Sequence, residues 1–197
     1  MCIRDSVTGM AFETWPQLLL DFKNGALKRN YDQSPQMNFS NLPLPRKDLL
    51  PKFSYISKNT IQATFGCPYK CDFCAVISTQ KKYLRRPVED VIKEISEMNG
   101  NFVTFIDPSP MEDKKYIKRL LREMIPLKKM WGGLATVKIG DDEELMDLCA
   151  ESGCKGLLIG FESVEQDALV EINKGFNVVE KYRNLCTRLH ERGIAIN

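Results

Sequence analysis

The chain has 197 residues, of which 43% are hydrophobic and 27% are charged, and its net charge is +2. These values are typical of an ordinary soluble globular protein and give no indication of a nucleic-acid or membrane-surface partner. The longest apolar runs are too short to span a bilayer, and the start of the chain has no apolar segment typical of a signal peptide. We therefore expect a cytoplasmic protein with no transmembrane segment, whose seven cysteines are ligands or buried thiols and not disulfides.

The first 57 residues lack the regular alternation of apolar strands and helices that the rest of the chain shows. Thr14, followed by an early proline, predicts the start of one short helix that Gly25 ends. The segment NLPLPRKDLLPKF at 41–53 is kept extended by its prolines and is predicted to be a linker or a wrapping arm. We therefore expect residues 1–57 to form an N-terminal junction segment and residues 58–197 to form a separate domain.

From residue 58 onward, apolar strands alternate with amphipathic helices. The predicted strands are 61–65, 102–106, 133–137, 155–161 and 194–197. The predicted helices are 87–98, 114–124, 141–151, 163–175 and 178–192. Asp141 is the expected cap of the third helix, and SVEQ at 163–166 has the pattern of a capping box. This alternation implies parallel strands covered by helices, hence an α/β fold, and we expect the chain to stop inside its fifth strand.

Three cysteines lie in one short stretch directly after the first predicted strand. In GCPYKCDFC they are Cys67, Cys71 and Cys74. The carboxyl end of a strand is where α/β barrels carry their chemistry. A structural zinc site closes with four ligands, and an iron–sulfur cubane has four irons that normally take four thiolates. Three thiolates would leave one iron open to bind a small molecule.

The spacing Cys67-x-x-x-Cys71-x-x-Cys74, with Phe73 before the last cysteine, resembles the signature of radical S-adenosylmethionine (radical SAM) enzymes. In that family the three cysteines hold a [4Fe-4S] cluster, whose open iron chelates the amino and carboxylate groups of S-adenosylmethionine. One electron from the cluster cleaves the sulfur–carbon bond, and the 5′-deoxyadenosyl radical abstracts hydrogen from a substrate. The resemblance implies that the three cysteines are metal ligands in an incomplete parallel (β/α) barrel.

Three further residues match positions of the family. Phe73 matches the aromatic residue that flanks the adenine. Glu162, in GFES after the fourth predicted strand, falls where the family places a polar group that faces the ribose or the methionine part. Asp107, in IDPSP, matches the acidic beginning of the turn that holds the amino group, although the prolines there depart from the family's pattern. The resemblance therefore implies that Phe73, Asp107 and Glu162 bind S-adenosylmethionine.

A longer resemblance covers residues 12–197. The helix at 13–25, the proline-rich arm and the run CKGLLIGFESVEQDAL resemble the subgroup of radical SAM proteins that carries an upstream cobalamin-binding domain. It implies that residues 1–57 are the tail of such a domain plus a linker, and that the radical SAM core at 58–197 is truncated at its C-terminus. We expect cobalamin only in a longer parent protein and not on this chain alone.

The implied function is hydrogen abstraction or radical methylation of an unidentified small-molecule or lipid-like substrate. An electron donor such as a flavodoxin or ferredoxin is implied with it. Two alternatives stay open at this point. A noncatalytic iron–sulfur or electron-transfer module would need a fourth thiolate, such as Cys149 or Cys154 folded nearby. A structural zinc protein would be distinguished by metal analysis.

Overall fold

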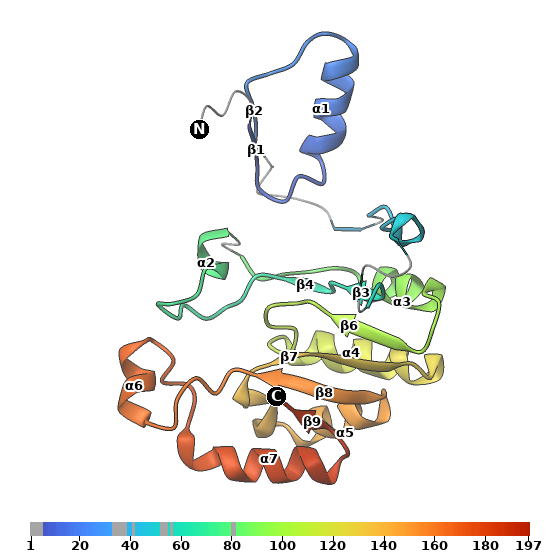
Figure 1. Ribbon diagram of the computed structural model, residues 1–197. Coiled ribbons are helices and arrows are strands. Elements are labelled where there is room, and N and C mark those ends of the chain that lie inside the picture. Colours follow the sequence, from blue (N-terminus) through green and yellow to red (C-terminus); the bar gives the residue numbers. More distant parts are fainter. Residues whose placement is uncertain (1–5, 33–38, 41, 52–54, 56, 80–81) are drawn as a thin grey trace. The chain divides into compact units, whose positions relative to one another are not determined.

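The computed structural model describes residues 6–32, 39–40, 42–51, 55, 57–79 and 82–197. The chain divides into two compact units, Met1–Pro43 and Leu44–Asn197 (Figure 1). The domain boundary predicted between residues 57 and 58 stays a prediction. The predicted arm at 41–53 lies partly outside the described residues, and its described part contains one short 3₁₀ turn, η1 (Lys47–Leu49).

The first unit contains a helix between two short parallel strands. β1 (Ser6–Thr8) pairs with β2 (Asn30–Asp32), and α1 (Thr14–Lys23) lies between them in the chain. The predicted helix is confirmed, but its N-cap residue is Glu13 and not Thr14, and no side chain caps it. The two strands were not predicted, because segments of three residues are too short to show an alternating apolar pattern.

A five-stranded parallel sheet is the centre of the second unit (Figure 1). In spatial order its strands are β3 (Thr60–Ile61), β6 (Phe102–Phe105), β7 (Met130–Ala135), β8 (Cys154–Ile159) and β9 (Ala195–Ile196). Each neighbouring pair is parallel. In β8 the side chains of Leu157 and Ile159 are buried, whereas that of Leu158 is exposed. One face of the sheet therefore packs on the core and the other is open, as the predicted incomplete barrel requires.

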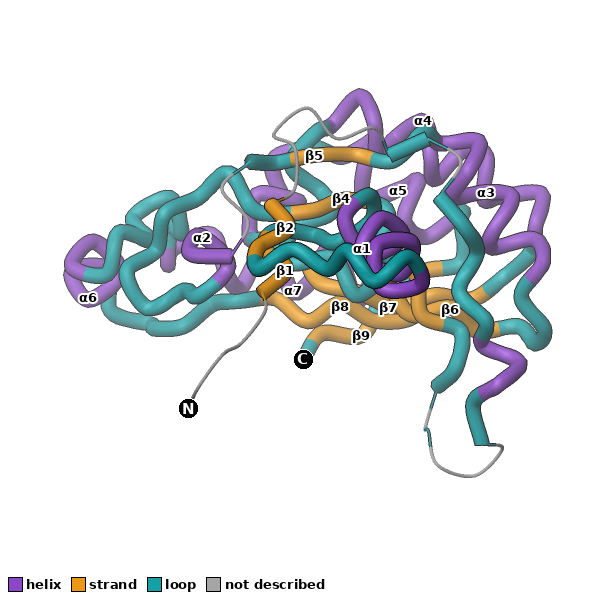
Figure 2. Tube along the Cα trace, turned by 90° about the horizontal axis from the view of Figure 1, so that it is seen from above, coloured by secondary structure: helices purple, strands orange, loops and turns teal. Residues whose placement is uncertain are grey.

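Four longer helices accompany the sheet. They are α3 (Val88–Glu97), α4 (Lys114–Met124), α5 (Glu143–Glu151) and α7 (Tyr182–Glu191). Figure 2 shows α3, α4 and α5 on the same side of the sheet, where their apolar faces and the inward side chains of the strands form one core. Asp142 and not Asp141 caps α5, because residues Val137–Asp141 form a 3₁₀ turn, η3, before the helix begins. None of the helices in the described part of the chain is both long and apolar enough to cross a membrane.

Several short elements lie between the strands and the longer helices. They are β4 (Thr64–Phe65), α2 (Val76–Thr79), β5 (Leu84–Arg85), α6 (Gln166–Glu171) and the 3₁₀ turns η2 (Ile125–Leu127) and η4 (Val179–Lys181). The strand predicted at 61–65 is in fact two, because β4 leaves the parallel sheet and pairs antiparallel with β5. The predicted capping box is wrong: the Ser163 hydroxyl accepts a hydrogen bond from the Glu165 amide, and Glu165 itself is the N-cap residue of α6.

A buried ion pair connects α3 to the residue after β5, and a hydrogen bond continues from there to the segment between β3 and β4. Arg86 Nη1 lies 2.8 Å from Glu94 Oε2, and both side chains are less than a tenth exposed. The same nitrogen donates to the carbonyl of Gln62 at 3.0 Å. Lys47 Nζ lies 3.0 Å from the other Glu94 oxygen, so the single carboxylate pairs with two cations. Such a network is costly to break, because its members have left water.

Candidate functional site

The predicted cysteine loop begins where β4 ends. Gly66 has a φ of +77°, a left-handed conformation that favours glycine, and it turns the chain out of the strand. The Cys74 amide donates to the Cys71 carbonyl at 3.0 Å, which closes a turn between the last two cysteines. Cys71 is 7% exposed, while Cys67 and Cys74 are half-buried. The three free thiols therefore lie on one short, folded loop.

All three cysteines line one cavity of about 480 Å³, together with Phe73 and Glu162. Its floor consists of residues at the carboxyl ends of β7 and β8, among them Leu134, Ala135, Leu158 and Ile159. This volume falls in the range of small-molecule and cofactor sites, about 300–1,000 Å³. The structure thus brings five of the six predicted site residues to the same open end of the parallel sheet.

The donor set of this cavity suits an iron–sulfur cluster. Thiolates are the usual ligands of such clusters, and here three of them come from one loop. In the part of the chain that the structure describes, no three His, Cys, Asp or Glu side chains are already grouped as a metal site requires. Burial raises the pKa of the Cys71 thiol, and the positive charge of Lys174 opposes that rise. The residue types and their location fit the cluster, although the three thiols are not grouped as closely as a bound metal would require.

Glu162 occupies a strained position just after β8. Its backbone φ is +63°, a value that residues other than glycine rarely adopt. One of its carboxylate oxygens, Oε1, lies 2.6 Å from Lys174 Nζ. A Cβ atom on Gly160 would lie 2.6 Å from the same oxygen and 2.8 Å from Nζ, so the missing side chain at residue 160 leaves room for the ion pair. The sequence indicated Glu162 but neither Lys174, which pairs with it, nor Gly160, which leaves room for the pair.

The segment after α6 folds back onto the cysteine loop. The Asp72 amide donates to the Ile172 carbonyl at 3.2 Å, and the Asn173 side-chain amide donates to the Asp72 carboxylate at 2.6 Å. The ammonium of Lys174 lies 5.6 Å from the centroid of the Phe73 ring, within the range of a cation–π contact. Two loops that are about a hundred residues apart in sequence therefore form one wall of the cavity.

Asp107 lies outside the lining of this cavity. Its side chain is fully buried, and its Oδ1 accepts hydrogen bonds from the Ala63 amide at 2.9 Å and from the amide and hydroxyl of Thr64. Its Oδ2 has no hydrogen-bond partner. Burial raises the pKa of Asp107 to about 6, against the hydrogen bonds that lower it. The carboxylate joins β6 to β4, whereas the residues that follow it, Pro108 and Ser109, do line the cavity.

Tyr69, Thr136 and Phe176 also line the cavity, and the sequence did not indicate them. The rings of Tyr69 and Phe176 are stacked with centroids 4.1 Å apart, and Nζ of Lys138, which does not itself line the cavity, lies 4.9 Å from the Tyr69 centroid. The Tyr69 hydroxyl donates to Glu112, which also accepts from the Thr136 hydroxyl at 2.9 Å. Burial, followed by the hydrogen bond to Glu112, raises the pKa of Tyr69, so its hydroxyl stays protonated.

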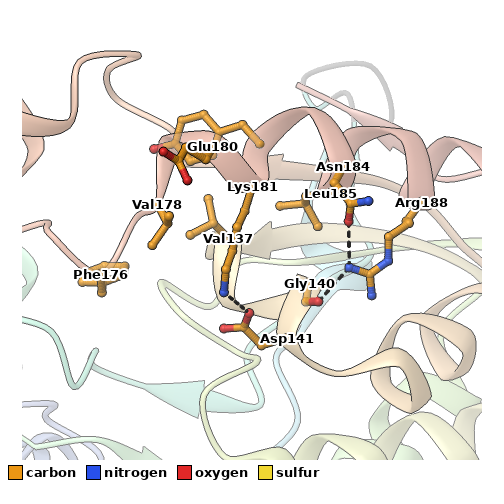
Figure 3. A pocket seen from close by; sticks show the side chains of 11 residues that line it. Val137, Gly140, Asp141, Phe176, Val178, Glu180, Lys181, Asn184, Leu185 and Arg188 are labelled. Carbon is orange, nitrogen blue, oxygen red and sulfur yellow. Dashed lines mark hydrogen bonds and ion pairs between the residues drawn. The ribbon is translucent and has the colours of Figure 1, made fainter.

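A neighbouring cavity of about 480 Å³ lies between η3 and α7 (Figure 3). Lys181 points to Asp141 at 3.0 Å, and Arg188 donates to the Gly140 carbonyl at 2.9 Å. Its residues are thus engaged with one another, and none of the six predicted site residues lines it. Phe176 lines both cavities.

The remaining described cysteines lie away from the loop. Cys149 and Cys154 are fully buried, and burial raises the pKa of Cys154 to about 12. Cys154 is the first residue of β8, whereas the cavity lies at the other end of that strand, where Leu158 and Ile159 line it. Five residues of strand span roughly 16 Å, so Cys154 is too far to be a fourth ligand. This geometry argues against Cys154 as the fourth thiolate of an electron-transfer cluster.

Comparison with known proteins identifies similar sequences. A family model described as the Radical SAM superfamily matches residues 61–196. Bacteriochlorophyllide d C-12(1)-methyltransferase of Chlorobaculum tepidum is 27% identical over 96% of this chain and 44% of its own length. An uncharacterized methyltransferase of Synechocystis is 30% identical over 68% of this chain and 27% of its own length. The chain therefore spans less than half the length of the curated relatives it matches.

A solved structure has the same fold. The cobalamin-dependent S-adenosylmethionine radical enzyme OxsB, with aqua-cobalamin bound, superposes with a TM-score of 0.78 at 16% identity. The match covers 96% of this chain and 32% of that one. At this identity the likeness concerns the fold alone, and it agrees with the incomplete parallel barrel.

Proposed function

The chain belongs to the Radical SAM superfamily, and from that membership we propose that the whole protein transfers a methyl group in a reaction that begins with reductive cleavage of S-adenosylmethionine. The observation that carries the proposal is that Cys67, Cys71 and Cys74 line one cavity together with Phe73 and Glu162. Methylation is favoured over simple hydrogen abstraction because the relatives described above are named methyltransferases.

Each residue has a role in this proposal. The three cysteines hold a [4Fe-4S] cluster, which supplies an electron and one open coordination site when bound. Phe73, whose side chain is exposed, offers its ring to the adenine. Glu162 accepts hydrogen bonds from the ribose or from the methionine amino group. Asp107 supports the amino-group contact indirectly. Its hydrogen bond to the Ala63 amide fixes the turn in which the next two residues, Pro108 and Ser109, line the cavity.

The proposal extends to partners that lie outside the chain. The reaction needs a one-electron donor such as a flavodoxin or ferredoxin, and a small-molecule or lipid-like substrate. We propose cobalamin as a cofactor of the whole protein only, held by residues other than those of this chain. A cytoplasmic location is part of the same proposal.

Anaerobic reconstitution with iron and sulfide tests the cluster. We expect about four irons and four sulfides per chain, the content of one cubane. Changing any one of Cys67, Cys71 or Cys74 to Ala should abolish the bound iron, because the remaining two thiolates hold a cubane poorly. Cys186→Ala is the matched control, since this half-buried thiol lies on α7, and it should keep the full iron content. Equal loss of iron from Cys149→Ala would contradict the proposal and favour a four-thiolate cluster.

A further inference from the structure

Lys174 is a buried cation that the proposed reaction has not yet used. Its side chain is 9% exposed, and its Nζ lies 2.6 Å from Glu162 Oε1. Lysine is rarely buried unless it is paired, because removing the ammonium from water is costly. Of the described residues that line the cavity, Lys174 alone carries a positive charge.

The backbone around Lys174 is fixed on the cysteine loop. Ile172 and Asn173 both bond to Asp72, which lies between the cysteines. Asn173 has a φ of +55°, and this left-handed residue turns the chain so that the next side chain points back toward Phe73. The ammonium is therefore held between the cysteine loop and the end of β8 by contacts on both sides.

Glu162 is paired with this cation in an uncommon backbone conformation. Its backbone is in the left-handed region, and it is one of only four described residues other than glycine with a positive φ. Its carboxylate is more exposed than the ammonium that holds it, at 37% against 9% of the side chain. One face of the carboxylate can therefore contact a ligand in the cavity while the other stays bonded to Lys174.

A positive charge in the cavity would also act on the cluster. A [4Fe-4S] cluster held by three thiolates would be net negative even with the charge of its irons counted, and Glu162 adds a further negative group, whereas the sulfonium and ammonium of S-adenosylmethionine outweigh its single carboxylate; in a partly enclosed space these charges interact more strongly than in water. Accepting an electron from a one-electron donor adds one more negative charge to the cluster. A nearby positive charge favours that reduced state.

We propose that Lys174 is a positioning residue of this site, which orients Glu162 toward S-adenosylmethionine and whose positive charge makes the cluster easier to reduce. The inference rests on the proposed function, because it requires the cluster and the cosubstrate to occupy this cavity.

Two variants that change the charge of the site in opposite directions test this proposal. Each is made in the full chain and reconstituted with iron and sulfide. Lys174→Met removes the positive charge, and the reduction potential of the cluster, followed by electron paramagnetic resonance during titration with dithionite, should become more negative. Glu162→Gln removes the negative charge and should shift the potential in the opposite direction. Lys181→Met is the matched control, since it breaks a lysine–aspartate pair outside the cavity, and it should leave the potential unchanged.

Binding of S-adenosylmethionine, measured by equilibrium dialysis, gives a second readout. Lys174→Met should weaken binding roughly tenfold to hundredfold, the range for a lost charge-assisted hydrogen bond, at unchanged iron content. Lys174→Arg should bind better than Lys174→Met, because it keeps the charge.

The outcomes separate this inference from the function beneath it. A wild-type chain that assembles no cluster or binds no S-adenosylmethionine would overturn the proposed function and this inference with it. A loaded wild-type chain whose potential and affinity are matched by Lys174→Met would overturn this inference alone. If Lys174→Met does not fold, unchanged potentials in Glu162→Gln and full loss of affinity in Lys174→Arg would overturn it equally.

Discussion

The hydroxyl of Thr64 donates to Oδ1 of Asp107 at 2.7 Å, and both side chains are fully buried. Two backbone amides, of Ala63 and Thr64, share the same oxygen, whereas Oδ2 has no partner. Burial outweighs these bonds and raises the pKa of Asp107 from 3.8 to about 6. The strand that precedes the cysteines is therefore joined to β6 by a carboxyl group that readily keeps its proton.

This geometry predicts a pH dependence of stability. Between about pH 4 and pH 6 the folded chain holds a proton on Asp107 that the unfolded chain has lost. The free energy of unfolding should therefore fall as pH rises through this window, by at most about 3 kcal/mol for a pKa difference of about 2 units. Asp107→Asn should remove this part of the slope in urea unfolding measured across the window. Asp167→Asn, at an exposed position of α6, should keep it, and equal slopes for Asp107→Asn and the wild type would contradict the assignment.

Gly160→Ala should disturb the site without unfolding the chain. The new Cβ would lie 2.6 Å from Glu162 Oε1 and 2.8 Å from Lys174 Nζ, which are the ends of flexible side chains. We expect the free energy of unfolding to change by less than about 1 kcal/mol, while S-adenosylmethionine binds more weakly. Gly156→Ala in β8 is the control, because its Cβ would meet only ordinary contacts at 3.7 and 3.9 Å. Unchanged affinity in Gly160→Ala would argue against a role for the ion pair in binding.

Gly153→Ala should be among the most destabilising single changes in the second unit. Its φ is +95°, and a Cβ there would lie 2.2 Å from the Lys129 carbonyl oxygen, a backbone atom that cannot move aside. We expect a loss of more than about 3 kcal/mol in urea unfolding. Gly193→Ala separates the two causes, since its φ is +70° but its Cβ would meet nothing within 4 Å, and it should cost about 1 kcal/mol. Similar losses for the two variants would show that the contact with Lys129 is unimportant.

Glu94→Gln should test the buried ion pair of the second unit. Without the carboxylate, both Arg86 and Lys47 lose their ion-pair partner. Removing one partner of a buried pair costs about 3–5 kcal/mol, because the other charge stays out of water. The exposed pair of Glu89 with Arg119 is the control, and Glu89→Gln should change stability little. A Glu94→Gln variant as stable as the wild type would show that the pair contributes no net stability.

The order of strands and helices could be predicted because it depends on local patterns. The α4 bounds agree with the predicted range 114–124 at both ends, since Asp113 caps the first turn and a strong apolar face follows. The cysteines and Glu162 could be located because each directly follows a strand. Lys174 could not, since the sequence placed it inside a helix ending near Gly175. In the structure the predicted capping box does not form and α6 ends at Glu171. Lys174 therefore lies in the turn after the helix, where its side chain reaches the site.

Asp107 shows where strand periodicity outweighs a motif. Successive residues of a strand point to opposite faces. Val103, Phe105 and Asp107 are all buried on one side, whereas Ile106 is 52% exposed on the other. Alternation along FVTFID therefore indicates that Asp107 faces the core, while the resemblance to the family's turn had implied that it binds the cofactor. The signal was present in the sequence but depends on the strand continuing regularly past Phe105.

The most direct test of the central claim is electron paramagnetic resonance of the reduced, reconstituted chain with and without S-adenosylmethionine. If Cys67, Cys71 and Cys74 leave one iron open in the cavity that Glu162 lines, S-adenosylmethionine binds that iron and the spectrum of the reduced cluster changes. An unchanged spectrum at saturating S-adenosylmethionine, in a chain that holds four irons, would contradict the account.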